Sequence, residues 1–140
     1  MQPALYLFFD GACHDAMTLY ADTLGGTIGD VVRNSDAPDP ASRMPGGDDL
    51  VMHMNMTVGD LTVMASDAPS AMYDAPKGFR VQLEPSSTEE FDRIHAALSK
   101  DARRVDMPVA ETFWAERFTM FTDRFGTPWM LSYTGAKARG

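Results

Sequence analysis

The sequence predicts an α+β fold in which two paired βαβββ modules form curled mixed sheets around a cavity. Three observations lead to this prediction. Short segments rich in alternating apolar residues are separated by Gly, Pro and Asp, which is typical of strands and turns. One segment in each half instead has apolar residues at helical spacing. The two halves also align with each other through their first three predicted elements.

The first half contains one predicted helix among four predicted strands. Residues 4–10 are rich in aromatic and aliphatic side chains and predict a strand. The helix over residues 13–24 has apolar side chains at Met17, Tyr20 and Leu24, and the Gly25-Gly26 pair ends it. The remaining predicted strands are residues 27–33, 50–58 and 61–67, the last two joined by a turn at Gly59-Asp60.

The strand over residues 50–58 alternates between two kinds of side chain. Met52, Met54 and Met56 lie on one predicted face, while His53 and Asn55 lie on the other. We therefore expect the methionine face to be buried and the histidine face to be different in character.

The second half repeats this order. A strand is predicted over residues 79–84, with Phe79, Val81 and Leu83 on one face. Pro85 ends it, since proline has no N–H for the sheet. A helix carrying Phe91, Ile94 and Leu98 follows after a possible Ser or Thr cap at residues 86–88. A strand near residues 103–107, a loop through Pro108 and a hairpin at residues 123–126 complete the half.

A single offset of 74 positions aligns the two halves. It pairs apolar residues throughout, for example Met17 with Phe91, Tyr20 with Ile94 and Leu24 with Leu98. The predicted modules are residues 1–68 and 77–135, which together form one compact fold. Neither module alone could bury its sheet, so the two are expected to pair.

The composition excludes several classes of protein. The 140 residues carry a formal net charge of −8, so neither nucleic acid nor an anionic membrane is an expected partner. No apolar segment approaches the roughly 18 residues of a spanning helix, and no secretory leader is recognisable. Cys13 is the single cysteine, which precludes an internal disulfide and indicates a cytoplasmic protein. We interpret Cys13 as a small apolar residue near a helix start.

Several segments resemble PhnB-like proteins (3-demethylubiquinone methyltransferase-like) of the vicinal oxygen chelate superfamily, which includes glyoxalases, bleomycin-resistance proteins and dioxygenases. The resemblance covers nearly the whole chain and is carried by Leu7-Phe8-Phe9-Asp10-Gly11, Leu24-Gly25-Gly26, Val51-Met52-His53, Met64-Ala65-Ser66-Asp67, Thr112-Phe113-Trp114, Asp123-Arg124-Phe125-Gly126 and Trp129-Met130. It implies paired βαβββ modules around a cavity, often in a homodimer. No glycine-rich turn for adenosylmethionine supports the methyltransferase label.

The resemblance also implies where a divalent metal would bind in metal-using members. Four ligands, usually His or Glu, come from the first and fourth strands of each module. The corresponding residues here are Ala4, Met64, Gly78 and Met130. A register shifted by one places Leu5 and Phe79 on the first strands instead. None of these is a ligand for zinc or a hard cation, so no metal or other cofactor is predicted.

The candidate ligand-binding residues lie on the strand faces opposite the apolar ones. Parity places His53, Asn55, Tyr6 and Phe8 on the cavity side of the first module. His53 is either a hydrogen-bonded strand residue or a ligand contact and general base. Ser66, at the end of the first module, is included in the candidate set, whereas Asp67 is expected to cap a turn.

The second module adds three candidates. Arg80 and Gln82 occupy the positions equivalent to Tyr6 and Phe8. An inward Arg80 would bind a carboxylate or another anion, and an Arg80 at the sheet margin would reach water. Trp114, on a loop, is either a lid over the cavity or a dimer contact.

These observations predict a small-molecule-binding protein that lacks the usual divalent metal site, with its ligand and any reaction left open. Sequestration of a ligand, as in bleomycin resistance, is one version. The alternative is a metal-dependent lyase, isomerase or dioxygenase with a shifted site that includes His53. A third interpretation is a structural dimer with a vestigial cavity. A homodimer is expected in each case.

Overall fold

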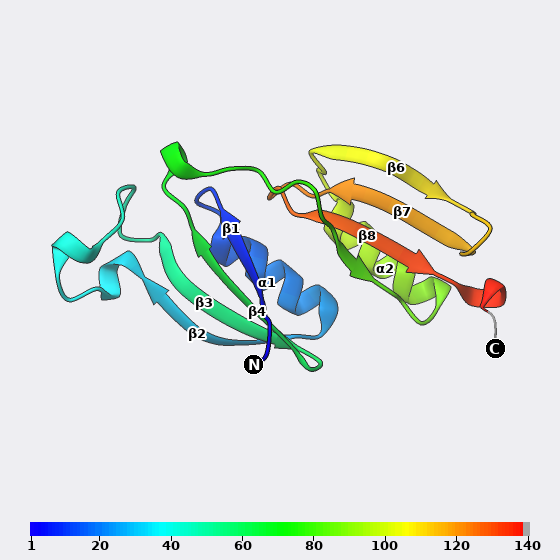
Figure 1. Ribbon diagram of the computed structural model, residues 1–140, viewed down its shortest axis with the longest axis horizontal. Helices are drawn as coiled ribbons and strands as arrows, with labels where there is room; N and C mark the ends of the chain where they lie inside the picture. Colours follow the sequence, from blue (N-terminus) through cyan, green and yellow to red (C-terminus); the bar gives the residue numbers. More distant parts are fainter. Residues whose placement is uncertain (139–140) are drawn as a thin grey trace. The chain divides into compact units, whose positions relative to one another are not determined.

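The computed structural model describes residues 1–138, which divide into two compact units, Met1–Asp74 and a second that begins at Ala75. Each unit has the element order β-α-β-β-β and a four-stranded mixed sheet (Figure 1). The predicted α+β fold of two βαβββ modules is therefore confirmed. Among the described residues, no helix has the length and apolar character needed to cross a membrane.

The first unit contains a sheet with one parallel and two antiparallel strand pairs. Its elements are β1 (Leu5–Phe9), α1 (Cys13–Leu24), β2 (Thr27–Arg33), β3 (Val51–Val58) and β4 (Leu61–Asp67). The strand order is β1-β4-β3-β2, with β1 parallel to β4. Strands β1 and β3 therefore lie on either side of β4, which sets the distance between the candidate residues that they carry.

The second unit has the same topology. Its elements are β5 (Val81–Leu83), α2 (Thr88–Ser99), β6 (Arg104–Ala110), β7 (Arg117–Thr122) and β8 (Pro128–Tyr133). The strand order is β5-β8-β7-β6, with β5 parallel to β8. The predicted hairpin at residues 123–126 joins β7 to β8.

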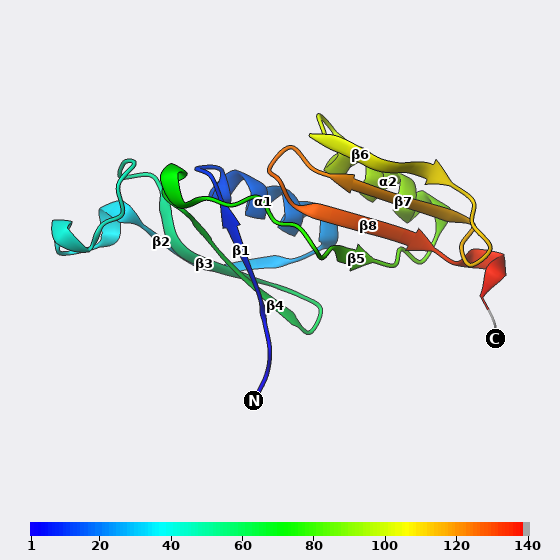
Figure 2. The ribbon, with the colours of Figure 1, turned by 45° about the horizontal axis from the view of Figure 1, so that its top comes forward.

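Each helix packs against the sheet of its own unit (Figure 2). On α1 the side chains of Met17 and Tyr20 are fully buried, and on α2 those of Phe91, Ile94 and Leu98 are buried. The predicted helix ends are also confirmed. Gly25 takes the left-handed conformation, with φ of 69°, that ends α1, while Ser87 Oγ accepts the backbone N–H of Glu90 at the start of α2.

Asp67 has a different role from the predicted turn cap. Its carboxylate is buried and accepts the backbone N–H of Cys13 at 3.0 Å and that of Val51 at 2.9 Å. Because no side chain at the N-cap residue Ala12 caps α1, a carboxylate at the end of β4 supplies the acceptor instead. Asp67 thus ties the start of α1 to the start of β3.

Cys13 is fully buried at the first position of α1, as its interpretation as an apolar residue requires. Burial raises the pKa of its thiol and the charge of Asp67 raises it further, with a smaller opposing effect from Arg33. Since the thiolate is the nucleophilic form, burial and the raised pKa both disfavour reaction at this thiol.

The second unit differs from its prediction at both of its outer strands. Strand β5 starts at Val81, so Phe79 lies before it and is 46% exposed instead of packing with Val81 and Leu83. Strand β6 runs through Pro108 to Ala110, where a loop was predicted. Strand β6 is an edge strand, and an edge tolerates proline because one side of the strand needs no N–H donor.

The alternation of β3 is also interrupted. Val51 and Met54 are both fully buried although they are three residues apart, while Met52 is only partly buried. The register between β2 and β3 shifts at the same point, between the pairs Val32–His53 and Arg33–Val51. The prediction that Met52 shares the buried face of Met54 and Met56 is wrong, because a strand irregularity changes the parity there.

Candidate functional site

In the first unit, three of the predicted residues gather on the face of the sheet opposite α1, which we call the helix-free face. Tyr6 and Phe8 alternate on β1 with the buried Leu7 and Phe9. The Tyr6 hydroxyl lies 3.3 Å from Nδ1 of His53 on β3, within hydrogen-bonding distance. The ring centroids of Tyr6 and Phe8 are 4.9 Å apart, and those of Tyr6 and His53 are 5.9 Å apart. The result is an aromatic surface with one polar pair, Tyr6 and His53.

Asn55 lies two residues farther along β3, and its amide approaches β2. It pairs in register with Met64, which in turn pairs with Tyr6, so Met64 separates the two predicted residues. The Asn55 amide lies over the backbone of Gly29, where an added Cβ would stand 2.3 Å from Asn55 Oδ1. Only glycine at position 29 leaves room for the amide in this place.

Ser66 pairs with Phe8 across the parallel strands β1 and β4 and is 5% exposed. Its strand position belongs to the helix-free face, but its side chain is covered in this unit. Trp114 belongs to the second unit, between β6 and β7, and is 43% exposed. Its ring packs edge-on against Phe113 and Phe118, and it does not line the depression described below.

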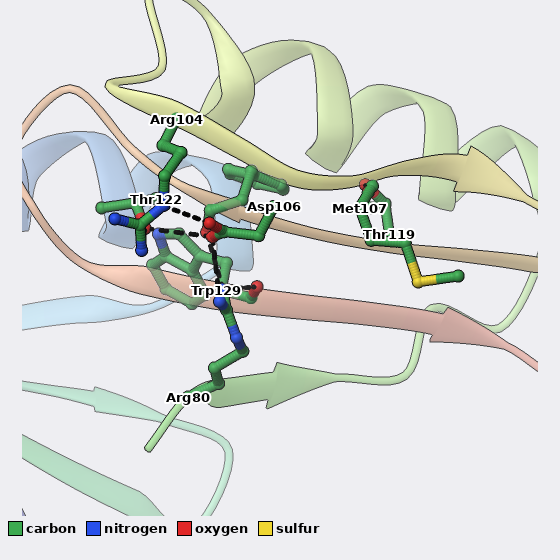
Figure 3. Close-up of polar contacts among 8 residues, drawn as sticks. Arg80, Arg104, Asp106, Met107, Thr119, Thr122 and Trp129 are labelled. Carbon is green, nitrogen blue, oxygen red and sulfur yellow. Dashed lines mark hydrogen bonds and ion pairs between the residues drawn. The ribbon is translucent and has the colours of Figure 1, made fainter. Parts of the chain in front are cut away.

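In the second unit, Arg80 lies just before β5 and reaches across the helix-free face (Figure 3). One guanidinium nitrogen donates to the carbonyl oxygens of Trp129 at 3.2 Å and Phe121 at 3.4 Å. The other donates to Oδ2 of Asp106 on β6 at 2.9 Å. Arg80 therefore connects the first strand of the sheet to the last, and both side chains of this ion pair are largely buried.

Asp106 is the centre of this network. Its carboxylate also pairs with Arg104 and accepts the Thr122 hydroxyl at 3.2 Å. Burial opposes its negative charge, but hydrogen bonds and charges from Arg104 and Arg80 outweigh burial and lower the pKa of the Asp106 carboxyl. The register between β6 and β7 shifts between Val105 and Met107, so Asp106 is the extra residue of a strand irregularity.

A depression of about 450 Å³ opens beside this network. Three of its lining residues are cationic, namely Lys77, Arg80 and Arg104. Its other lining residues are neutral: Pro76, Gly78, Phe79, Gln82, Pro128 and Met130. Since Asp106 neutralises one of the three positive charges, the depression keeps an excess of positive charge in a chain whose net charge is −8.

The sequence-based predictions included Arg80 and Gln82 but missed Lys77, Arg104 and Asp106. Lys77 lies in an irregular segment, where no periodicity indicates a direction. Arg104 and Asp106 are two residues apart in a predicted strand, which would have placed them on one face. That spacing was the signal in the sequence that could have indicated an ion pair between Arg104 and Asp106 on the same face as Arg80.

The residues implied by the superfamily resemblance do not fit a divalent metal site. Met64 pairs in register with Tyr6, and Met130 with Gln82, so the strand positions beside both methionines also lack a carboxylate or imidazole. Methionine offers only a soft thioether, and Ala4 and Gly78 offer no side-chain donor. Within residues 1–138, no group of three or more His, Cys, Asp or Glu side chains is placed to hold a metal ion.

The chain is similar to proteins of known sequence and structure. The family description Glyoxalase/Bleomycin resistance protein/Dioxygenase superfamily matches residues 4–131. Protein YjdN of Escherichia coli (strain K12) is 33% identical over an alignment of 135 residues, and the match covers 91% of this chain and 91% of that protein. The crystal structure of protein PA1353 from Pseudomonas aeruginosa has 39% identity and a TM-score of 0.83, covering 95% of this chain and 97% of that one.

A PhnB protein from Bacillus cereus, described as a 3-demethylubiquinone-9 3-methyltransferase, shares the fold. Its TM-score is 0.81 at 20% identity, with 95% of this chain and 99% of that chain covered. Because the family match spans most of the chain and the YjdN similarity spans 91% of it, this chain belongs to the Glyoxalase/Bleomycin resistance protein/Dioxygenase superfamily.

Proposed function

We propose that this chain binds a small organic anion in the depression of the second unit, and that it does so without a divalent metal. The observation that carries the proposal is the meeting of Lys77, Arg80 and Arg104 around one depression of an otherwise acidic chain. Three cations in one place would repel each other without an anion nearby. Asp106 supplies one negative charge, and a bound anion would supply the rest.

The three cations have different parts in this proposal. The Arg80 side chain is 21% exposed and is held by Asp106 and two backbone carbonyls, so it fixes the shape of the depression. The Arg104 side chain is 68% exposed and keeps guanidinium donors for a ligand. Lys77 is exposed and contributes a mobile positive charge.

The neutral lining suits the rest of an organic ligand. Phe79, Pro128 and Met130 offer apolar surface beside the cations, and methionine adapts to ligands of different shape. None of Tyr6, Phe8, His53, Asn55, Ser66 and Trp114 lines this depression, and their predicted role as ligand-binding residues stays a separate proposal. A homodimer burying at least roughly 1,000 Å² also stays a proposal, which light scattering tests directly.

Isothermal titration calorimetry with benzoate and its neutral counterpart benzamide tests the function. We expect benzoate to bind and benzamide to bind at least about tenfold more weakly, because only benzoate forms charge-assisted hydrogen bonds. Arg104→Gln should weaken benzoate binding about three- to tenfold. The matched control is Arg103→Gln, since Arg103 donates to the Arg124 carbonyl and does not line the depression.

Equal affinities for benzoate and benzamide would contradict the proposal. An unchanged benzoate affinity in Arg104→Gln would do the same, because it would place the binding elsewhere.

A further inference from the structure

Three polar side chains follow one another along and beside β5 with a spacing of two residues. They are the cation Arg80, the neutral amide Gln82 and the carboxylate Glu84. Residues two apart on an extended chain project to the same side, at intervals of about 6.6 Å. Arg80 and Gln82 line the depression, and Glu84 lies just beyond it. The lining of the depression therefore combines cationic groups with an amide that lies two residues from Arg80.

Glu84 determines which end of the Gln82 amide faces the depression. Nε2 of Gln82 donates to Oε1 of Glu84 at 3.0 Å. An ionised carboxylate can only accept hydrogen bonds, so the amide must turn its NH₂ group toward Glu84. The opposite orientation would bring two acceptor oxygens together. The oxygen Oε1 of Gln82 is then left as an acceptor on an exposed side chain, where water or a ligand can donate to it.

Resting on the proposed function, we infer that the bound anion also carries a hydrogen-bond donor, a hydroxyl or an N–H, about one two-residue strand interval from its anionic group. The anionic group meets Arg104, Lys77 and Arg80, and the donor meets Oε1 of Gln82. Glu84 is a positioning residue, because it acts on the ligand only through the orientation of the Gln82 amide. Anions without the donor displace water from the Gln82 oxygen without replacing its hydrogen bond, and bind more weakly.

Two para-substituted benzoates of nearly equal size test this inference. 4-Hydroxybenzoate has an anionic group and a donor at opposite ends of its ring, whereas 4-methoxybenzoate has lost the donor and keeps the oxygen. Calorimetric titration of the wild-type protein should show at least about a fivefold preference for 4-hydroxybenzoate, the value expected for one neutral hydrogen bond.

Three variants separate the parts of the argument. Gln82→Met keeps the length of the side chain and removes the acceptor, so the preference should disappear. Glu84→Gln lets the Gln82 amide take either orientation, so the preference should fall below about twofold. Glu89→Gln removes the charge of another exposed glutamate, in the first turn of α2, and should keep the wild-type preference. Circular dichroism spectra confirm that each variant is folded.

The outcomes distinguish this inference from the proposed function. If benzoate binds, and Arg104→Gln weakens it, but the wild type binds both para-substituted probes equally, the donor inference is overturned and the anion site stands. A preference that survives in Gln82→Met also overturns it. If none of the benzoates binds, both proposals fall.

Discussion

The helix-free face of the first unit carries the aromatic group Tyr6, Phe8 and His53, whereas that of the second carries the ion-pair network of Arg80, Asp106 and Arg104. The two faces belong to sheets of identical topology. Positions facing the helices are apolar in both units, because each helix must bury a matching apolar stripe. Positions facing away from the helices have no such constraint, and the chemical difference between the units is found there.

The two units also use a buried carboxylate in different places. In the first unit, Asp67 accepts two backbone N–H groups and joins α1 to β3. In the second, Asp123 accepts the N–H groups of Phe125 and Thr127 and the indole N–H of Trp129, all at 2.8–2.9 Å. One carboxylate fixes a helix to a sheet, and the other closes a hairpin and orients a core tryptophan.

The largest effect that we predict concerns these carboxylates. Asp123→Ala should lower the free energy of unfolding by about 4 kcal/mol, because it removes the carboxylate that accepts three N–H groups, two of them buried. Asp67→Ala, which removes the acceptor of two donors, should cost about 1 kcal/mol less. Urea denaturation of both variants measures the difference.

Asp123→Asn is the control for the shape of the side chain. Its amide can keep one acceptor oxygen for the two backbone N–H groups but loses an acceptor for the Trp129 indole, so its stability should be intermediate. A smaller loss in Asp123→Ala than in Asp67→Ala would contradict the comparison.

A smaller effect is expected on the two helix-free faces. Arg80→Met should cost about 1–2 kcal/mol, because Asp106 then keeps only the more exposed Arg104 as a cationic partner. Tyr6→Phe, at the equivalent position of the repeat, should cost less than about 0.5 kcal/mol, since it removes one exposed hydrogen bond. Thermal or urea unfolding compares the two variants.

The double variant Arg80→Met/Asp106→Asn sharpens this comparison. If the loss in Arg80→Met comes from an underpaired carboxylate, neutralising position 106 should recover part of it, and a double-mutant cycle measures the coupling. Strictly additive effects would show that Arg80 stabilises the sheet through its carbonyl contacts alone.

The fold was predictable because the periodicity of the apolar residues and the residues that begin or end each element indicated the same structure. The apolar stripes of both helices, the glycine at the end of α1 and the serine cap of α2 are local signals with one structural meaning. The errors occurred where tertiary context decides. Pro108 is accepted within β6 because that strand is at an edge, and edge position is not visible in a single strand's sequence.

The candidate site was harder to predict because parity fails at strand irregularities. The prediction that His53 lies opposite the helix agrees with the structure. The prediction for Met52 is wrong, because the register between β2 and β3 shifts between His53 and Val51. Asp106 was overlooked for a related reason: its importance comes from a register shift and from Arg80, which is 26 positions away in sequence. Sequence spacing alone cannot identify partners that only the sheet order brings together.

The smallest effect concerns a titrating ring between α2 and its sheet. His95 stacks on Phe91 and meets the edge of Phe121, at the repeat position that Ala21 occupies in the first unit. Burial lowers the pKa of His95, although the charge of Asp92 acts in the opposite direction.

Because the folded protein binds the His95 proton less readily than the unfolded chain, acidification favours unfolding. The contribution of neutral His95 to the free energy of unfolding is fully present above the ordinary histidine pKa of about 6.5. It is lost as the pH falls through the lower pKa of the folded state. The partial exposure of the ring limits the loss to less than about 0.5 kcal/mol.

His95→Gln should remove this part of the pH dependence. Urea denaturation of wild type and variant at about pH 7.5 and about pH 5.5 measures it. Equal losses in both proteins would show that His95 does not couple folding to pH.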